Sequence, residues 1–307
     1  MNLSVELAPK HPRGLSLANP VMTASGTFGY GTEYQHLFDI QELGAIVCKG
    51  TTLEPREGNA QPRLAETACG LLNSIGLQNI GVKAVIEEKA PIWANWRVPV
   101  IVNIAGSSVE EYARVAGMLD GVAGISAIEV NIGCPNVKAG GAEFGTNPDS
   151  AARVVAAVKE KTSLPLLVKL TPNTADIAGV AGAVVEVGAD AISLINTLKG
   201  MAIDVARRQP LLGNKTGGLS GPAIKPVALY MVYEVASAVD VPVVGCGGII
   251  TAKDAIEFIM AGATAVQVGT ANLIDPRAPS DVIRGMVEFM EKEGTGDIRK
   301  LIGIAQH

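Results

Sequence analysis

The feature that most constrains this chain is a regular alternation of short apolar runs with amphipathic stretches, which starts near residue 20. The runs are rich in β-branched residues, and the stretches between them, such as "VEEYARVAGMLDG" and "AKDAIEFIMAG", have helical periodicity. Eight runs follow one another: "PVMTAS", "GAIVCK", "VPVIVNIA", "SAIEVN", "LPLLVKL", "AISLIN", "VPVVGCGG" and "TAVQVGT". Eight strand–helix units in succession favour a single α/β domain over residues 1–307, a closed (β/α)8 TIM barrel, rather than two doubly wound domains.

The composition suits the core of such a barrel and excludes several classes of protein. Apolar residues make up 48% of the chain and aromatic residues only 4%, so Val, Ile, Leu and Ala must fill the core. The formal net charge is -5 and no basic cluster is present, which argues against nucleic acid as a partner. No apolar run is long enough to cross a bilayer and the N-terminus does not read as a signal peptide, so we expect a cytoplasmic protein without a membrane anchor.

Two connections are too long to be plain turns, residues 49–79 after the second run and residues 197–221 after the sixth. In a barrel both would be βα loops on the C-terminal face, where active sites are assembled. Long loops at that face commonly cover a ligand. We therefore expect these insertions to cover the mouth of the barrel.

The apolar runs carry polar residues or glycines at their C-terminal ends, and in a barrel all these ends meet at one rim. They are Ser25, Lys49, Asn103, Asn131, Lys169, Asn196, Gly247 with Gly248, and Gly269 with Thr270. Polar groups buried there without partners would cost several kcal/mol each, so the set as a whole predicts a ligand site. Any single Asn of the set could equally serve neighbouring backbone groups.

Two of these strand ends have the composition of a phosphate cradle. "GCGGI" and "QVGT" place glycine N–H groups and the Thr270 hydroxyl before helices on adjacent strands, with Gly221 of "GGLSGPAIKP" as a third element. The alternative is that these glycines only permit tight turns. Because no GxGxxG motif follows any strand, the phosphate would belong to a mononucleotide.

Lys49 and Lys169 each follow an otherwise apolar run, so their ammonium groups would converge on the barrel mouth. A buried lysine needs an anion or an electron-rich acceptor to remain charged. The N1/O2 edge of a flavin and a substrate carboxylate are two such acceptors. Either lysine could instead extend into bulk water.

Cysteine usage indicates a reduced protein with one thiol in an unusual place. The four cysteines are widely spaced and form no CxxC pair, so we expect neither a disulfide nor a metal or iron–sulfur site in this chain. Cys48 and Cys246 fall at apolar strand ends and are expected to be packing residues, and Cys69 lies in a loop without an assigned role. Cys134, in "NIGCPNVKAGGAEFG", stands between a buried strand and a glycine-rich polar segment, where a packing thiol is out of place.

A set of segments occurs in a specific order along the chain: "NSIGLQN" (73–79), "NIGCPNVKAGG" (131–141), "VKLTPN" (168–173), "NT" (196–197), "GGLSGPAIKP" (217–226), "GCGGI" (245–249) and "VGT" (268–270). Together they resemble the class 1 dihydroorotate dehydrogenases over nearly the whole chain. Each segment alone would be a weak signal, whereas the ordered set is highly specific. The resemblance implies a (β/α)8 barrel that carries FMN and oxidises dihydroorotate to orotate in pyrimidine synthesis.

The resemblance also assigns roles to individual positions. Cys134 matches the catalytic base, which takes the C5 proton of dihydroorotate while the C6 hydride goes to the flavin. The segment 131–145 would be a lid that carries this base over the substrate. The positions that match flavin contacts are Ser25, Lys49, Gly50, Asn103, Asn131, Lys169, Ile195, Gly221, Gly247, Gly248, Gly269 and Thr270. The positions that match substrate contacts are Lys49, Asn73, Ser74, Ile75, Gly76, Leu77, Asn131, Asn136, Asn196 and Thr197.

The resemblance is greater to class 1B than to the other classes. A cysteine base without an N-terminal membrane helix favours class 1 over class 2, and "NSIGLQNIG" is more similar to class 1B than to class 1A. This implies a homodimer of the chain within a heterotetramer, whose second subunit holds FAD and a [2Fe–2S] cluster and passes electrons to NAD⁺. Gly133 departs from the pattern, since many relatives carry Ser beside the base, and it could loosen the loop.

The sequence leaves three alternatives open. The first is a fumarate-reducing homodimer of class 1A, and the second is a dihydropyrimidine-type dehydrogenase with the same flavin barrel. The third is a non-catalytic barrel that binds a phosphate compound. The third is disfavoured because a binding module needs neither a positioned thiol nor two converging lysines.

Overall fold

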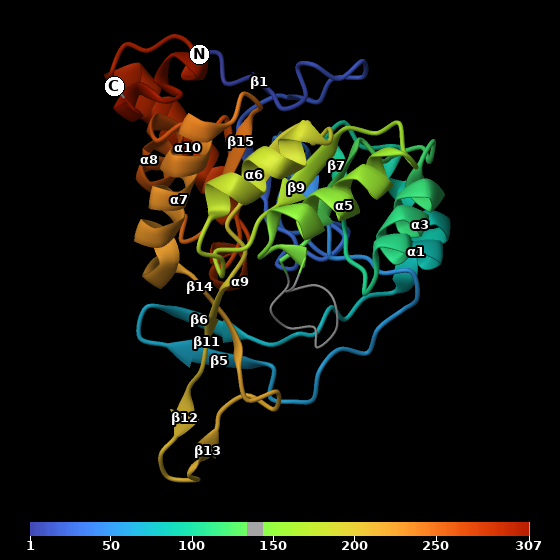
Figure 1. Ribbon diagram of the computed structural model, residues 1–307. Coiled ribbons are helices and arrows are strands. Elements are labelled where there is room, and N and C mark those ends of the chain that lie inside the picture. Colours follow the sequence, from blue (N-terminus) through green and yellow to red (C-terminus); the bar gives the residue numbers. More distant parts are fainter. Residues whose placement is uncertain (134–143, 307) are drawn as a thin grey trace.

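Eight parallel strands close into a barrel in the computed structural model, which describes residues 1–133 and 144–306 (Figure 1). In chain order they are β3 (Val21–Thr23), β4 (Ala45–Val47), β7 (Val100–Ile104), β8 (Ala127–Asn131), β9 (Leu166–Lys169), β10 (Ala191–Leu194), β15 (Val243–Cys246) and β16 (Ala265–Val268). Neighbours in this order pair in parallel, and β16 closes the ring by pairing with β3. The predicted (β/α)8 barrel is confirmed, and each strand lies within its expected apolar run.

Helices pack around the outside of the barrel (Figure 1). They are α1 (Gly81–Ala84), α2 (Ala90–Trp93), α3 (Val109–Leu119), α5 (Pro148–Lys159), α6 (Ile177–Glu186), α7 (Lys225–Ala238), α8 (Ala252–Met260), α9 (Ala271–Ile274) and α10 (Ala278–Lys292), and a π-helical turn, Val85–Lys89, joins α1 to α2. Local capping explains where several of them begin. Ser108 caps α3 by accepting a hydrogen bond from the backbone of Glu111, and Thr251 with Asp254 forms a capping box at α8.

The first βα connection departs from the prediction, because it contains no α-helix. Residues 24–44, all of which the structure describes, form turns that end in a short 3-10 helix at Ile40–Glu42. Several glycines of this segment have positive φ, which interrupts helical geometry. Aromatic packing replaces the helix, since Phe28 is fully buried and stacks on Tyr34 with ring centroids 4.0 Å apart.

The two long connections pair with each other to form a second sheet. Its antiparallel order is β11 (Leu198–Gly200), β14 (Gly217–Ser220), β6 (Gly70–Asn73) and β5 (Leu64–Thr67). A hairpin of β12 (Ile203–Asp204) and β13 (Gln209–Pro210) extends from it away from the barrel (Figure 1). The sheet lies at one end of the barrel, and the N-terminal hairpin of β1 (Val5–Glu6) and β2 (Ser16–Leu17) lies at the other. The insertions are therefore on the expected face, although their pairing was not predicted.

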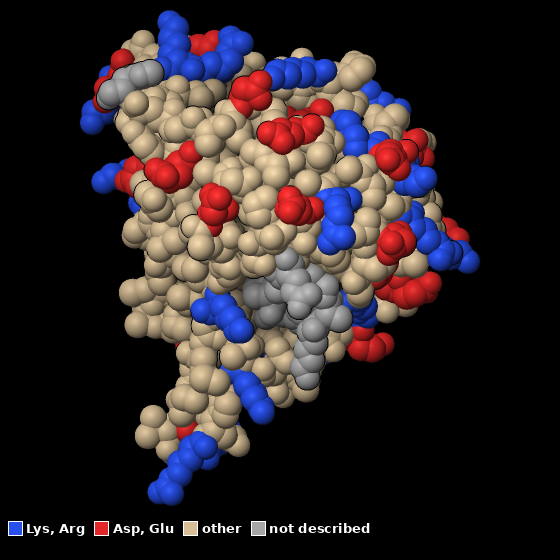
Figure 2. All heavy atoms as spheres, viewed as in Figure 1, with Lys and Arg blue, Asp and Glu red and all other residues tan. Residues whose placement is uncertain are grey.

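Aliphatic side chains fill the barrel and the layer between strands and helices, as the composition requires. Every residue of β7 and β8 is buried, and the largest fully buried side chains include Trp93, Tyr112 and Phe258. No helix in the described part of the chain is long and apolar enough to cross a membrane. Acidic and basic side chains are interspersed on the face shown in Figure 2, without a continuous basic patch.

Candidate active site

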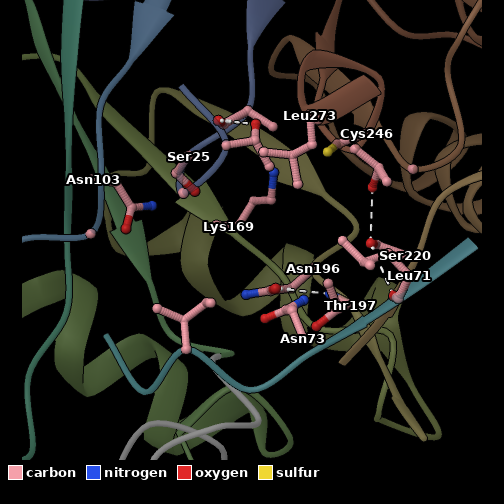
Figure 3. Close-up of a pocket in the computed structure, with 18 of the residues that line it drawn as sticks. Ser25, Leu71, Asn73, Asn103, Lys169, Asn196, Thr197, Ser220, Cys246 and Leu273 are labelled. Carbon is pink, nitrogen blue, oxygen red and sulfur yellow. Dashed lines mark hydrogen bonds between the residues drawn. The ribbon is translucent and has the colours of Figure 1, made fainter. Parts of the chain in front are cut away.

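A cavity of about 260 Å³ opens at the carboxyl ends of the barrel strands, beside the inserted sheet (Figure 3). Every residue predicted to contact the flavin lines this cavity: Ser25, Lys49, Gly50, Asn103, Asn131, Lys169, Ile195, Gly221, Gly247, Gly248, Gly269 and Thr270. Most of the predicted substrate contacts line it too: Lys49, Asn73, Ile75, Gly76, Leu77, Asn131, Asn196 and Thr197. Residues that lie far apart in the sequence are thus gathered in one site.

Three of the predicted site residues are not among those that line the cavity. The Ser74 side chain is fully buried, and its hydroxyl accepts a hydrogen bond from Asn59 Nδ2 at 3.1 Å. Cys134 and Asn136 lie outside the described residues. The expected lid, 131–145, is described only at its two ends.

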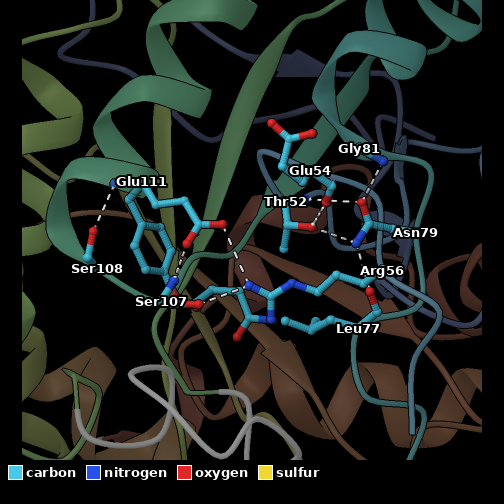
Figure 4. Close-up of polar contacts among 11 residues, drawn as sticks. Thr52, Glu54, Arg56, Leu77, Asn79, Gly81, Ser107, Ser108 and Glu111 are labelled. Carbon is cyan, nitrogen blue, oxygen red and sulfur yellow. Dashed lines mark hydrogen bonds and ion pairs between the residues drawn. The ribbon is translucent and has the colours of Figure 1, made fainter.

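The loop that carries the predicted "NSIGL" contacts is held by the side chain of Asn79 (Figure 4). Asn79 Nδ2 donates to Thr52 Oγ1 at 2.8 Å and to the Leu77 carbonyl at 2.7 Å. Its Oδ1 accepts from the backbone N–H groups of Thr52 and Gly81. These bonds hold Leu77 in the left-handed region, with φ of 56°. A non-glycine residue in that region indicates that the loop conformation is imposed by its surroundings.

Arg56 ties this same loop to the next βα connection (Figure 4). Its backbone exchanges hydrogen bonds with that of Asn79 in both directions. Its guanidinium donates to Ser107 Oγ at 2.9 Å and lies 3.6 Å from a carboxylate oxygen of Glu111. These contacts brace the wall of the cavity from outside its lining, since none of Arg56, Ser107 and Glu111 lines the cavity.

Asn131 and Asn196 form one hydrogen-bonded pair at the cavity. Asn196 Nδ2 donates to Asn131 Oδ1 at 3.1 Å, while Asn196 Oδ1 accepts from the backbone N–H of Thr197 at 2.8 Å. The Tyr112 hydroxyl fixes the end of β8 by donating to the Asn131 carbonyl at 2.7 Å. Because Asn131 Oδ1 is an acceptor in this pair, Nδ2 is the donor that it can offer to a ligand.

Both predicted lysines lie at the cavity and not in bulk water. Lys169 is only 4% exposed, and its Nζ donates to Gln267 Oε1. Lys49 is half-buried, and burial lowers its pKa below the usual lysine value, an effect that Glu33 partly offsets. Such a lysine gains from the approach of an anionic or electron-rich ligand group.

Asn103 contributes a buried acceptor. Its side chain is fully buried, and its Oδ1 has no hydrogen-bond partner among the described residues. An unsatisfied buried amide oxygen costs free energy unless a ligand or water supplies an N–H or O–H group. Figure 3 shows this amide at the cavity wall. The cavity is therefore suited to a ligand that has a donor at this position.

The glycine segments form the other end of the cavity. Gly247 and Gly248 have φ of 133° and 75°, and a Cβ on Gly248 would lie 2.7 Å from Lys225 Cβ. No side chain fits there, so the backbone can approach a ligand closely. On the adjacent strand, Thr270 Oγ1 donates to Ser220 Oγ at 2.9 Å. This geometry is compatible with the predicted phosphate cradle.

The start of α8 limits which backbone N–H groups the predicted cradle can use. The Asp254 carboxylate accepts from the backbone N–H groups of Ile250 and Thr251 at the start of α8, at 3.1 and 2.8 Å. These N–H groups are therefore not available to a phosphate. After β15, the N–H groups that could bind a phosphate must therefore come from the turn at Gly247 and Gly248 and not from the start of α8.

The described cysteines differ in their surroundings. Cys48 is fully buried, and burial raises its pKa to about 12, so it stays a neutral thiol. Cys246, expected only to pack, lines the cavity. Its position inside "GCGGI", the predicted phosphate turn, was the signal that could have placed it there. Cys69 is exposed at the turn between β5 and β6.

Gly133 has a packing explanation that the sequence did not reveal. Its Cα is buried against Thr171, and a Cβ at this position would lie 2.5 Å from Thr171 Cβ. Its N–H donates to Asn131 Oδ1 at 3.3 Å. The absence of a side chain at Gly133 therefore lets the segment after β8 pass close to Thr171, which follows β9.

Comparison with known proteins identifies the family of this chain. A sequence model of the family described as dihydroorotate dehydrogenase matches residues 9–290. The dihydroorotate dehydrogenase B (NAD(+)) catalytic subunit of Geotalea uraniireducens is 55% identical over 98% of this chain and 97% of its own length. The proteins of the same description from Desulforamulus reducens and Desulforudis audaxviator are 55% and 56% identical, covering 99% and 95% of both chains.

A solved structure supports the fold independently. The structure of DHODH from Eimeria tenella in complex with ferulenol superimposes with a TM-score of 0.84, covering 100% of this chain and 89% of that one, at 21% identity. The family match covers most of the chain, and the relatives match it over nearly their full length. The chain therefore belongs to the dihydroorotate dehydrogenase family, within the class 1B group of these relatives.

Proposed function

We propose that this protein oxidises (S)-dihydroorotate to orotate in the de novo synthesis of pyrimidines, with FMN bound in the cavity at the barrel mouth. The observation that carries the proposal is that every predicted flavin contact lines one cavity. The descriptions of relatives at 53–56% identity support it as well. They favour it over a class 1A enzyme, a dihydropyrimidine-type dehydrogenase or a non-catalytic barrel.

The residues at the cavity fit FMN. The turns at Gly221, Gly247 to Gly248, and Gly269 to Thr270 would hold the phosphate through backbone N–H groups. Asn103 Oδ1, which has no partner within residues 1–133 and 144–306, and the buried ammonium of Lys169 offer an acceptor and a donor to the ring. FMN bound there would supply the acceptor for the C6 hydride.

The substrate would lie between the ring and the inserted loops. Lys49 would neutralise the carboxylate, and Asn73, Asn131 and Asn196 would orient the ring amides by matched donors and acceptors. A base must take the C5 proton from the face opposite the flavin, and Cys134 has that role in our proposal. This assignment rests on the sequence alone, because Cys134 lies outside the described residues.

A Cys134→Ser variant tests the base directly. A serine hydroxyl is scarcely ionised at neutral pH, so dihydroorotate should reduce the flavin of this variant far more slowly. Cys48→Ser is the matched control, since Cys48 is buried away from the cavity lining. Unchanged half-reaction kinetics in the Cys134→Ser variant would remove Cys134 from the mechanism.

We further propose a cytoplasmic heterotetramer, in which a homodimer of this chain binds a second subunit that carries FAD and a [2Fe–2S] cluster. The support is the description of the relatives as catalytic subunits of an NAD(+) enzyme. Untagged native protein should copurify with an iron- and FAD-containing subunit and reduce NAD⁺ with dihydroorotate. Robust turnover of the isolated chain with fumarate would contradict this assembly.

A further inference from the structure

Glu129 is a buried carboxylate inside the barrel that no role has yet explained. It lies in the middle of β8, is fully buried and is not among the residues that line the cavity. Asn103 Nδ2 donates to its Oε1 at 2.8 Å, and Ser193 Oγ and Gln267 Nε2 donate to its Oε2 at 2.8 and 2.7 Å. These donors come from three other strands of the barrel, β7, β10 and β16. The carboxylate is thus the centre of an interior polar cluster.

The carboxylate determines which way two neighbouring amides face. An ionised carboxylate only accepts hydrogen bonds, so each amide must turn its nitrogen toward Glu129. The amide oxygens then point the other way. Asn103 Oδ1 is left without a partner among the described residues, at the cavity, and Gln267 Oε1 accepts from Lys169 Nζ.

The cluster also balances charge. Glu129 and Lys169 are both buried, and Gln267 bridges them with one hydrogen bond to each. An isolated charge in this interior would be strongly unfavourable, whereas a carboxylate and an ammonium linked through an amide compensate each other. The charge of the Lys169 ammonium, which reaches the cavity from β9, is thus compensated by the Glu129 carboxylate on the neighbouring strand β8.

We propose that Glu129 is a positioning residue that sets the hydrogen-bond polarity of the flavin site, so that the cavity has an acceptor at Asn103 and a cationic donor at Lys169. This inference rests on the proposed binding of FMN. The polar edge of an isoalloxazine ring carries an N–H donor beside carbonyl and ring-nitrogen acceptors. An amide oxygen suits the N–H group, and an ammonium suits the acceptor that becomes negative on reduction.

Glu129→Gln is the informative substitution, because it keeps the shape and removes the charge. Its NH2 group would meet an amide NH2 group, so one neighbouring amide must turn over or lose its bond. If Asn103 turns, a donor faces the N–H of the ring; if Gln267 turns, a donor faces the Lys169 ammonium. In either arrangement a buried donor at the flavin site is left unsatisfied, which corresponds to about tenfold or more in affinity for FMN.

A compensating double variant separates polarity from general damage. In Glu129→Gln/Gln267→Glu, the amide oxygen introduced at position 129 can accept from Asn103, and the amide nitrogen introduced there can donate to the carboxylate introduced at position 267. That carboxylate can also accept from Lys169, so the charge and the facing of Asn103 are both restored. Ser193→Ala is the matched control, since it removes a donor to Glu129 from the same cluster but leaves both amides oriented.

The test is to titrate FMN into each apoprotein, following quenching of flavin fluorescence and the visible spectrum of the bound flavin, with thermal unfolding measured in parallel. We expect the dissociation constant for FMN to rise about tenfold or more in Glu129→Gln and to change less than about threefold in Ser193→Ala and the double variant. Equal losses in Ser193→Ala and Glu129→Gln, or no change in Glu129→Gln, would overturn the inference.

The remaining outcomes are also decisive. If Glu129→Gln does not fold, the double variant decides: near wild-type affinity supports the inference, and folded protein with weak binding overturns it. Wild-type apoprotein that binds no FMN would instead overturn the proposed function, and the inference with it.

Discussion

Lys49 is the cation that the proposed mechanism places against the substrate carboxylate, and Lys49→Met removes its charge while keeping most of its apolar stem. Lys49 follows β4 closely, lines the cavity and is half-buried, and burial lowers its pKa. A ligand carboxylate would supply the partner that this desolvated ammonium needs. The substitution should therefore weaken carboxylate binding specifically.

The magnitude follows from the kind of contact. A hydrogen bond to a charged group contributes about 1.5–3 kcal/mol when both groups are partly shielded from water. Since about 1.4 kcal/mol corresponds to a tenfold change, the KM for dihydroorotate and the Kd for orotate should rise roughly ten- to a hundredfold. The affinity for uracil, which has the ring without the carboxylate, should stay nearly unchanged.

The pH dependence provides a second check. In the free site the lowered pKa of Lys49 marks where the ammonium is lost, and a bound carboxylate raises that pKa. Orotate affinity should therefore be constant below the free-site pKa and fall as the pH rises above it, whereas Lys49→Met should not show this fall. The reasoning is refuted if Lys49→Met weakens uracil and orotate equally at full FMN occupancy.

Three further substitutions test the packing of the site. Gly248→Ala should lower the free energy of unfolding by about 2 kcal/mol, because φ is 75° and the new Cβ would lie 2.7 Å from Lys225 Cβ. Thermal unfolding and FMN retention measure the effect, and wild-type values for both would contradict the proposed phosphate cradle. Gly133→Ser should lower the unfolding temperature, since its Cβ would lie 2.5 Å from that of Thr171; an unchanged temperature would show that this contact relaxes freely. Tyr112→Phe removes the 2.7 Å hydrogen bond to the Asn131 carbonyl, so the free energy of unfolding should fall by about 1 kcal/mol and the KM for dihydroorotate should rise. An unaltered KM would show that this bond does not position the site.

Much of the fold could be predicted because the signals are local. Each barrel strand is a short β-branched run. The capping residues Ser108 and Thr251 bind backbone N–H groups only three residues further along the chain. The helix expected after β3 is replaced by an aromatic cluster, which depends on tertiary contacts such as that between Phe28 and Tyr34. The sheet of β6 with β14 joins segments about 145 residues apart, so no local pattern could reveal it.

The site was predictable to the extent that strand ends converge in a barrel. Lys49, Asn103 and Lys169 could be placed at one rim because each lies at or near the C-terminal end of an apolar run. The orientation of their side chains could not, because it depends on hydrogen bonds across the barrel. Glu129 was missed for this reason, although a charged residue within the apolar run "SAIEVN" was a signal that could have found it.

The central claim is tested most directly by mixing the FMN-loaded protein with dihydroorotate in the absence of air and recording the visible absorbance of the flavin. Our account predicts that dihydroorotate bleaches this absorbance and that one orotate forms for each flavin reduced. Dihydrouracil, which lacks the carboxylate for Lys49, should leave the absorbance unchanged. Bleaching by dihydrouracil and not by dihydroorotate would show that the substrate is wrong. A fully loaded protein whose flavin neither compound reduces would contradict the proposed reaction itself.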